Sequence, residues 1–361
     1  MSSPFGVYLH IPFCASKCDY CAFATWTDRH HLVDDYLAAL LDDLRRATGE
    51  GMPAASTVFV GGGTPTQVPA ERLAQVIAAI PTRPGAEVTV ECNPDDVDVE
   101  LLAAFRSGGV NRVSIGVQSM SPHVLATLGR THDPESVERA VAAVRSVDLP
   151  SFNLDLIYGG AGETLDDWAA TVEATLRLDP PHVSAYGLTV EPGTALALDP
   201  ERHPDDDHQA DEYEVADDLL TGAGLDNYEI SNWAHPGHES AHNRLYWGQH
   251  DYRGFGCAAH SHAAGRRWWN VRTPERYIDL VRRGESTEAA GETLDDAVRR
   301  LEGRQLALRM REGVESDAFD GSDLELLDGL VEPHSDLGER VVLTRRGRLL
   351  ANEISTRLRA D

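Results

Sequence analysis

The sequence predicts an α/β fold built around a parallel β-sheet, and two observations lead to that prediction. Segments rich in Val, Ile, Tyr and Phe alternate about six times with amphipathic segments over the first half of the chain, which is typical of a parallel sheet, open or closed into a barrel. Cys, Gly, Glu, Gln or Asp residues follow or end these strand-like segments. Chemistry in such folds lies at the carboxyl ends of the strands, so we expect these side chains to meet at one site.

The elements follow from this alternation in chain order. The expected strands cover residues 7–10, 57–60, 87–90, 112–117, 152–157 and 182–188. The expected helices cover residues 31–47, 70–80, 98–107, 134–147 and 164–177. In the first helix, apolar side chains such as Leu37, Leu40 and Leu44 fall on one stripe. Pro134 and Thr164 are typical of helix N-termini and predict where two of the later helices begin.

The alternation weakens after about residue 190. Residues 199–209 form an acidic loop that lacks the glycine and the distal glutamate of an EF-hand, so we interpret it as a solvated loop. Residues 228–270 are dense in aromatic residues, His and Gly. A small helical unit is expected from about residue 293. It contains helices over 293–310 and 322–331, a strand over 341–344 and a last helix over 347–358.

Composition excludes several classes of function. The chain of 361 residues has 59 acidic and 32 basic side chains, a net charge of −27 that repels nucleic acid. No run of about 18 apolar residues predicts a membrane helix, and no basic-then-apolar leader is visible, so we expect a cytoplasmic protein. Three of the five cysteines lie within eight residues, which favours a metal site over a disulfide framework.

The cysteine motif is Cys14-x3-Cys18-x2-Cys21. Three thiolates can hold three corners of a [4Fe–4S] cluster and leave the fourth iron open, where S-adenosylmethionine can bind through its amino and carboxylate groups. The alternatives are a zinc site completed by a histidine, or three unrelated cysteines. Zinc sites favour two cysteine or histidine pairs separated by a loop, and a second pair is absent from the sequence. The cluster is therefore the prediction.

The motif, with Tyr20 before its last cysteine, resembles the signature of the radical SAM superfamily. Other segments look like its oxygen-independent coproporphyrinogen III oxidase branch. They are Tyr8-x-His10-Ile-Pro-Phe13, Gly61-Gly-Gly-Thr-Pro65, Glu91-x-Asn93-Pro94, Arg112-Val-Ser-Ile-Gly-Val-Gln118, Leu128-Gly-Arg130-x-His132, Asp155-Leu-Ile-Tyr-Gly159, Leu343-Thr-x-x-Gly347 and Asn352-Glu-Ile354. The resemblance covers nearly the full chain.

This resemblance implies a fold, a division of the chain and a cofactor site. The implied fold is a radical SAM partial (β/α)6 barrel with a small, mainly helical, winged-helix-like C-terminal domain. The core barrel would cover residues 1–190, a connecting and capping region 191–290, and the C-terminal domain 291–361. The residues that would contact S-adenosylmethionine are Tyr8, Tyr20, Gly62, Gly63, Thr64, Glu91, Gln118, Arg130 and Asp155. Their chemistry suits the role, since glycines allow close approach and arginine pairs with a carboxylate.

Two departures separate the chain from the oxidases. Those enzymes carry a further cysteine two residues after the third, where this chain has Phe23, and a longer N-terminal arm than the seven residues before Tyr8. His242-Asn243-x-x-Tyr246-Trp247 instead resembles the heme-binding signature of HemW-type heme chaperones. By that resemblance His242 would ligate heme, and Asn243, Tyr246 and Trp247 would complete the pocket. His242 could instead order a loop over the barrel mouth, with His260 or His262 as the alternative ligand.

The first expectation is therefore a heme chaperone that uses a [4Fe–4S] cluster and S-adenosylmethionine, and that passes heme to a membrane or respiratory acceptor. The alternative is a radical enzyme that oxidatively decarboxylates coproporphyrinogen III to protoporphyrinogen IX. A radical enzyme with another substrate is a third hypothesis. The sequence does not decide whether the protein is an enzyme or whether it forms a homodimer.

Overall fold

Six parallel strands form the centre of the computed structural model, which describes residues 3–361. They are β1 (Phe5–Ile11), β2 (Ala55–Gly62), β3 (Thr82–Cys92), β4 (Arg112–Gln118), β5 (Ser151–Tyr158) and β6 (His182–Gly187). They lie side by side in chain order, and every neighbouring pair is parallel. All six strands overlap the segments predicted from the sequence, which confirms the α/β fold and its parallel core.

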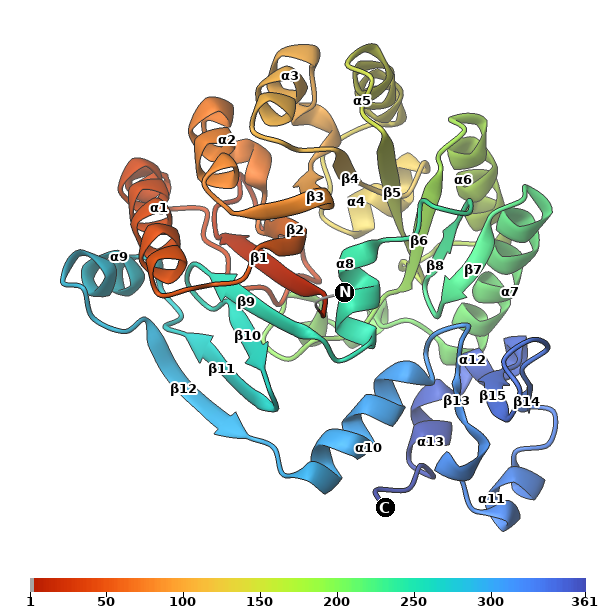
Figure 1. Ribbon diagram of the computed structural model, residues 1–361. Helices are drawn as coiled ribbons and strands as arrows, with labels where there is room; N and C mark the ends of the chain where they lie inside the picture. The colour runs from red at the N-terminus through yellow and green to blue at the C-terminus, as the bar shows by residue number, and fades with distance from the viewer. Residues whose placement is uncertain (1–2) are drawn as a thin grey trace.

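Helices cover the outer face of this curved sheet (Figure 1). They are α1 (Val33–Gly49), α2 (Ala70–Ala78), α3 (Val99–Ser107), α5 (Pro134–Ser146), α6 (Leu165–Arg177) and α7 (Asp206–Gly222). The short helix α4 (Pro122–Thr127) lies inside this row, where its Val124 packs in a small cluster with Ile157 and Leu188. The predicted start signals are confirmed. Pro134 is the first residue of α5, and the Thr164 side chain caps α6 by accepting from the Asp167 backbone N–H.

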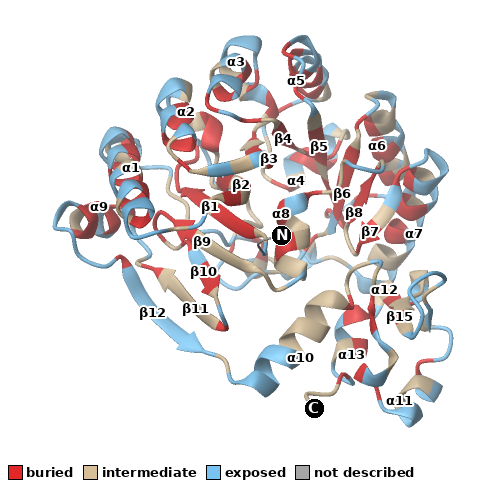
Figure 2. Ribbon diagram, viewed as in Figure 1, coloured by how far each residue is buried: buried red, intermediate tan, exposed pale blue. Residues whose placement is uncertain are grey.

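The two faces of the six strands differ in polarity, because side chains alternate along a strand. Apolar side chains such as Leu9, Val60 and Ile115 point outward and pack beneath the helices as the main core. Polar side chains such as Glu91, Ser114 and Asp155 alternate with them and line a cavity on the inner face. The outer face of the sheet is therefore apolar and the inner face is polar. The inner face carries the side chains that can bind ligands or take part in chemistry. Figure 2 shows the burial of the strands beneath the helices.

The sheet continues beyond the six strands at both edges. Beyond β1 it adds β9 (Asp251–Phe255), β10 (His260–Ala263), β11 (Arg266–Asn270) and β12 (Glu288–Thr293), and beyond β6 it adds β8 (Asn232–Ala234) and β7 (Asp226–Glu229). β9 is parallel to β1, and the other added pairs are antiparallel. Two helices accompany them, α8 (Ala241–Trp247) and α9 (Pro274–Arg282). These added strands were not among the elements predicted from the sequence for the aromatic segment over residues 228–270.

The C-terminal segment surrounds a second, smaller core that includes Leu308, Phe319 and Ile354. Its helices are α10 (Asp296–Ala307), α11 (Gly321–Leu326), α12 (Arg345–Leu349) and α13 (Ala351–Ser355). A three-stranded antiparallel sheet joins them, formed by β13 (Val314–Glu315), β14 (Val331–Pro333) and β15 (Arg340–Leu343). The single last helix expected over 347–358 is instead two short helices, and the expected strand is β15. Over residues 3–361, none of the helices has the length and apolar character needed to span a bilayer.

Candidate functional site

The cysteine loop, residues 12–26, leaves the end of β1 and returns beside it. Phe13 and Trp26 form an isolated bridge that closes the base of the loop. The Cys14 N–H donates to the Trp26 carbonyl at 3.2 Å, and the Trp26 N–H donates to the Pro12 carbonyl at 2.8 Å. Cys14, Cys18 and Cys21 are all free thiols, and all three line one cavity. The loop therefore presents three soft ligands to one space at the carboxyl end of the strands.

Glycines after β2 let the cysteine loop pack closely. The Gly63 N–H donates to the Ile11 carbonyl at 2.8 Å, and a Cβ at Gly63 would lie 2.7 Å from that oxygen and 3.0 Å from the Cys14 sulfur. Gly62 has a φ of +105°, and its Cβ would lie 2.2 Å from a His10 ring nitrogen. A side chain at Gly63 would displace the cysteine loop, and one at Gly62 would displace the His10 ring on β1. This explains why a run of glycines follows this particular strand.

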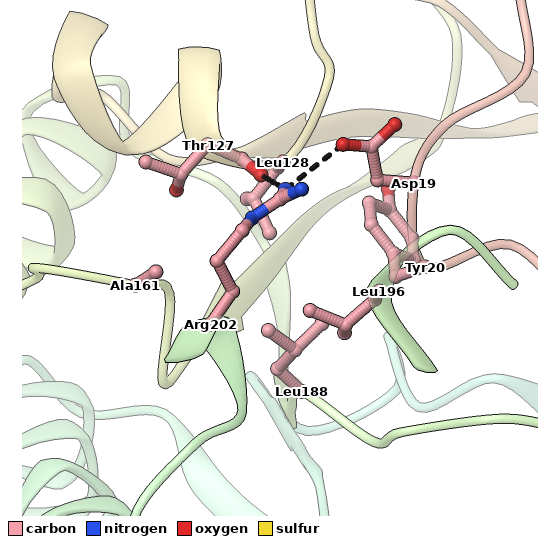
Figure 3. Close-up of a pocket in the computed structure, with 8 residues that line it drawn as sticks. All are labelled: Asp19, Tyr20, Thr127, Leu128, Ala161, Leu188, Leu196 and Arg202. Carbon is pink, nitrogen blue, oxygen red and sulfur yellow. Dashed lines mark hydrogen bonds and ion pairs between the residues drawn. The ribbon is translucent and has the colours of Figure 1, made fainter. Parts of the chain in front are cut away.

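The far side of the cysteine loop is held by the segment between β6 and α7. The Arg202 guanidinium donates to the Asp19 carboxylate at 2.9 Å and also to the Thr127 carbonyl (Figure 3). The Leu196 N–H donates to the Asp19 carbonyl at 2.9 Å. Figure 3 shows Tyr20 and Leu196 beside these contacts. The loop is thus anchored on both sides before any ligand binds.

The cavity beside the cysteine loop, called here the cysteine cavity, has a volume of about 790 Å³. Besides the three cysteines it is lined by eight of the nine residues predicted to contact S-adenosylmethionine. They are Tyr20, Gly62, Gly63, Thr64, Glu91, Gln118, Arg130 and Asp155. The ninth, Tyr8, lines a neighbouring cavity, and its hydroxyl lies 3.0 Å from the His10 Nδ1 atom. These residues, from four strands and three loops, therefore meet in one space, as the position of chemistry at the strand ends predicts.

Two carboxyl groups give the cysteine cavity its acidic character. Burial and, to a smaller extent, the charge of Asp155 raise the pKa of Glu91 to about 8, against the hydrogen bond from the Gly62 N–H at 3.1 Å. Burial also raises the pKa of Asp155, against hydrogen bonds that include one from the Ser114 hydroxyl at 2.6 Å. Two such groups in one cavity are relieved by a ligand that brings hydroxyl donors or a positive charge.

A cation and a strained glutamine lie opposite these carboxyl groups. The Arg130 guanidinium donates to the Asn93 side-chain oxygen at 2.7 Å and to the Gly116 carbonyl at 3.0 Å, and it approaches the Cys18 sulfur at 3.6 Å. Gln118 has a φ of +64°, where the register between β4 and β5 shifts. Such backbone strain is typical of a functional position. Arg130 can therefore hold a ligand carboxylate beside the thiols.

The donor set of the cysteine loop suits a [4Fe–4S] cluster. The three thiols line one roomy cavity, and the Thr64 hydroxyl donates to the Cys14 sulfur at 3.5 Å. Burial raises the pKa of Cys14, so the thiolate gains from a nearby cation or metal cluster. A group that spreads its ligands around a cube suits this arrangement.

A second cavity of about 700 Å³ adjoins the first and is called here the aromatic cavity. The two share Phe23, Phe59, Gly62, Glu91 and Asn243 in their linings. The other side chains of the aromatic cavity include Tyr8, His10, His242, Tyr246, Tyr252, His260, Trp269 and Arg272. Two cavities with a common wall allow a ligand in one to approach a ligand in the other.

Helix α8 supplies one wall of the aromatic cavity and lies inside the arc of strands (Figure 1). The Ser240 hydroxyl accepts from the Asn243 N–H at 3.2 Å, and the Glu87 carboxylate accepts from the Ala241 and His242 N–H groups at 3.0 Å each. A capping hydroxyl and a negative charge at the N-terminus explain why this short segment is helical.

The predicted heme residues are only partly brought together. His242 is 1% exposed, its Nδ1 atom lies 2.9 Å from the Thr57 hydroxyl, and its Nε2 atom lies 2.8 Å from the Tyr246 hydroxyl. Asn243 lines both cavities. Trp247 is not brought to the aromatic cavity, because its ring lies 5.7 Å from the Arg309 guanidinium on the side of the C-terminal segment. Ligation of iron by His242 stays a prediction.

Sequence reasoning missed the role of the β9–β11 strands, which supply Tyr252, His260 and Trp269 to the aromatic cavity. The alternation of polar and aromatic residues over 251–270 was the available signal. It is short and interrupted by glycines, so it predicted no strands.

Comparison with known proteins agrees with this geometry. Residues 8–175 match the family model described as the radical SAM superfamily. The solved structure of coproporphyrinogen III oxidase (HemN) from Escherichia coli, described as a radical SAM enzyme, superposes with a TM-score of 0.83 and 25% identity, covering 98% of this chain and 89% of that chain. The fold and the cysteine loop thus define a radical SAM protein.

Two curated relatives narrow the assignment within that superfamily. The heme chaperone HemW of Mycobacterium tuberculosis is 40% identical over 97% of this chain and 94% of the relative. The heme chaperone HemW of Bacillus subtilis is 35% identical over 97% of each chain. The chain belongs to the HemW family.

Proposed function

We propose that the protein is a heme chaperone, which binds heme in the aromatic cavity and passes it to an acceptor protein. The observation that carries this proposal is the aromatic cavity itself, where several aromatic rings and three histidines surround about 700 Å³. That volume lies within the range of small-molecule sites, roughly 300–1,000 Å³. Aromatic side chains suit the faces of a porphyrin, and histidine is a usual ligand of its iron. The relatives named heme chaperones support the same reading.

Phe23 favours the function of a heme carrier over that of an enzyme that oxidises a porphyrinogen. It occupies the position where the oxidases have a further cysteine, its side chain is 65% exposed, and it lines both cavities. An exposed aromatic side chain at this boundary gives a porphyrin an apolar contact surface. It offers no thiol for chemistry on a substrate.

The cysteine cavity is proposed to hold the second part of the machinery. Cys14, Cys18 and Cys21 would hold a [4Fe–4S] cluster, and the cavity would take S-adenosylmethionine. When bound, the cluster supplies an open iron position and one-electron chemistry. The chain's own residues position the ligand: Arg130 would take its carboxylate, and Asp155 and Glu91 its hydroxyl or ammonium groups. Tyr8, Tyr20, Gly62, Gly63, Thr64 and Gln118 complete the proposed contacts.

His242, Asn243 and Tyr246 would then form the wall of the heme site, with Trp247 supporting α8 from outside it. The proposed acceptor is a membrane or respiratory protein, reached from the cytoplasm. The strongly acidic composition argues against a nucleic acid as partner.

An anaerobic assay on protein with a reconstituted cluster tests the proposal. Heme is titrated by absorbance, and transfer is followed with apomyoglobin as the acceptor. In parallel the protein receives coproporphyrinogen III, S-adenosylmethionine and a reductant, with an oxidase of known activity beside it. We expect stoichiometric heme binding, heme transfer and no protoporphyrinogen. Repeated turnover to protoporphyrinogen, or no heme binding, would overturn the proposal.

A further inference from the structure

Three histidines line the aromatic cavity, and they differ in what their ring nitrogens already contact. The His10 Nδ1 atom lies 3.0 Å from the Tyr8 hydroxyl, and its Nε2 atom lies 2.9 Å from the Ala24 carbonyl. His10 is 4% exposed, so both nitrogens are engaged within the protein. Coordination of a metal by either nitrogen would require breaking a buried hydrogen bond.

His242 is engaged in the same way. Its two nitrogens contact Thr57 and Tyr246, and its ring stacks on Phe59 with centroids 5.3 Å apart. The ring thereby ties α8 to β2 inside the barrel. This is a positioning role, which keeps Tyr246 and Asn243 at the wall of the cavity.

His260 is different, because it lines the cavity and its side chain is exposed. No hydrogen bond to its ring is formed within the part of the chain that the structure describes. The imidazole stacks on Trp269, with centroids 5.6 Å apart and an interplanar angle of 27°, so its orientation is fixed without using a nitrogen.

A cation lies at the same cavity. Arg272 is exposed, lines the aromatic cavity and forms no ion pair within residues 3–361. In a chain with an excess of acidic side chains, most arginines near the surface pair with a carboxylate, as Arg267 does with Glu292 and Glu302. An unpaired guanidinium beside an apolar cavity suits a ligand that carries its own carboxylates, and heme carries two propionates.

We propose that His260 on β10 coordinates the heme iron in the aromatic cavity, that Arg272 pairs with a heme propionate, and that His242 positions the cavity wall. The inference rests on the proposed heme-binding function. The proposed iron ligand is therefore on the β9–β11 strands and not in the His242 motif on α8. Coordination uses a ring nitrogen that is already without a partner and leaves the buried hydrogen bonds of His242 intact.

The test compares variants of the full chain with its cluster reconstituted. His260→Ala is loaded with ferric heme beside wild type, and His31→Ala serves as the control, since His31 is also an exposed histidine but lies outside the cavity lining. We expect His260→Ala to lose the absorption spectrum of imidazole-ligated heme, to bind heme about tenfold more weakly, and to regain the spectrum when imidazole is added. Arg272→Gln should weaken binding while keeping the wild-type spectrum.

Each contrary outcome points to one failure. Wild-type protein that binds no heme would overturn the proposed function together with this inference. Wild-type protein that binds heme, beside His260→Ala with an unchanged spectrum, would overturn the His260 assignment alone. Because His260 is exposed, its substitution should leave the fold intact, and an unchanged far-ultraviolet circular dichroism spectrum verifies this.

Discussion

The Nε2 atom of His242 lies 2.8 Å from the hydroxyl of Tyr246, one turn further along α8. This contact, together with the bond to Thr57, makes His242 a buried structural link. We expect His242→Ala to lower the free energy of unfolding by about 3 kcal/mol, because it leaves a cavity and two polar groups without their partner. Chemical denaturation followed by fluorescence measures the loss.

His31→Ala is the control for that experiment, since His31 is exposed and far from α8 in the chain. It should change stability by no more than about 0.5 kcal/mol. If His242→Ala were as stable as wild type, the ring would not be the link described here. If His242→Ala binds less heme, the unfolding measurement shows whether the variant has also lost the structure of the cavity wall.

The three cysteines of the loop are expected to hold the cluster jointly. Cys18→Ala should lose most of its iron and the broad visible absorption of a [4Fe–4S] cluster, because two thiolates hold a cluster poorly. Cys257→Ala is the matched control, since Cys257 is a fully buried core residue and lies outside the lining of the cysteine cavity. Iron and sulfide analysis after anaerobic reconstitution gives the result. Equal iron contents in the two variants would refute the assignment of the loop.

Asp155 is expected to contribute to S-adenosylmethionine binding through its charge. In Asp155→Asn one side-chain atom becomes an NH2 group facing the Asn153 amide, which donates to Asp155 at 2.7 Å in the wild type. We expect a loss of affinity of about tenfold with the cluster spectrum unchanged. Equilibrium dialysis with the reconstituted protein measures it. Asp95→Asn, an exposed acid on the same cavity, should bind nearly as wild type; equal losses would mean a general charge effect.

Much of this architecture could be predicted because the first half of the chain is locally consistent. Strand period, helix stripes and start signals such as Thr164 all agree with the parallel core. The convergence of Glu91, Gln118 and Asp155 followed from topology alone, since parallel strands present their carboxyl ends at one edge.

The aromatic cavity could not be predicted in the same way, because it depends on pairing between distant segments. β9 joins the sheet beside β1, although about 240 residues separate them in the chain, and this pairing brings His260 near Tyr8. The resemblance of the His242 motif to a heme-binding signature suggested an iron ligand, but it could not show that both ring nitrogens are engaged within the protein. Trp247 lies next to Tyr246 in sequence yet faces Arg309, because neighbouring helical positions point in different directions.

A buried acidic pair away from both cavities predicts a pH dependence of stability. Burial and, to a smaller extent, the charge of Glu163 raise the pKa of Glu212 to about 8, while the Gly159 N–H opposes the shift. An acid whose pKa is higher in the folded state binds more protons there, so stability falls as the pH rises from about 4.5 to about 8. Glu212→Gln removes this loss and should exceed wild type by about 2 kcal/mol at pH 9, with no advantage below pH 4.

Urea denaturation at several pH values tests this difference. Glu173→Gln on α6 is the control, because that side chain is exposed and should change stability equally little at every pH. A Glu212→Gln advantage that stays constant from pH 4 to pH 9 would show that packing, and not ionisation, separates the two proteins.

Arg202 is expected to protect the cluster without binding it. Its guanidinium ties Asp19 of the cysteine loop to the C-terminal end of α4 at Thr127, and its side chain is 26% exposed. Arg202→Ala should reconstitute to the same iron content as wild type under anaerobic conditions, since no ligand is lost. In air its cluster should bleach about fivefold faster, which corresponds to about 1 kcal/mol less free energy for opening the loop.

The control is Arg145→Ala. In the wild type the Arg145 guanidinium donates to the Leu178 carbonyl at 2.7 Å, away from the loop. If both variants bleach at the wild-type rate, the contacts of Arg202 shown in Figure 3 do not hold the loop closed. The packing of the loop against the glycines at the end of β2 would then be what holds it.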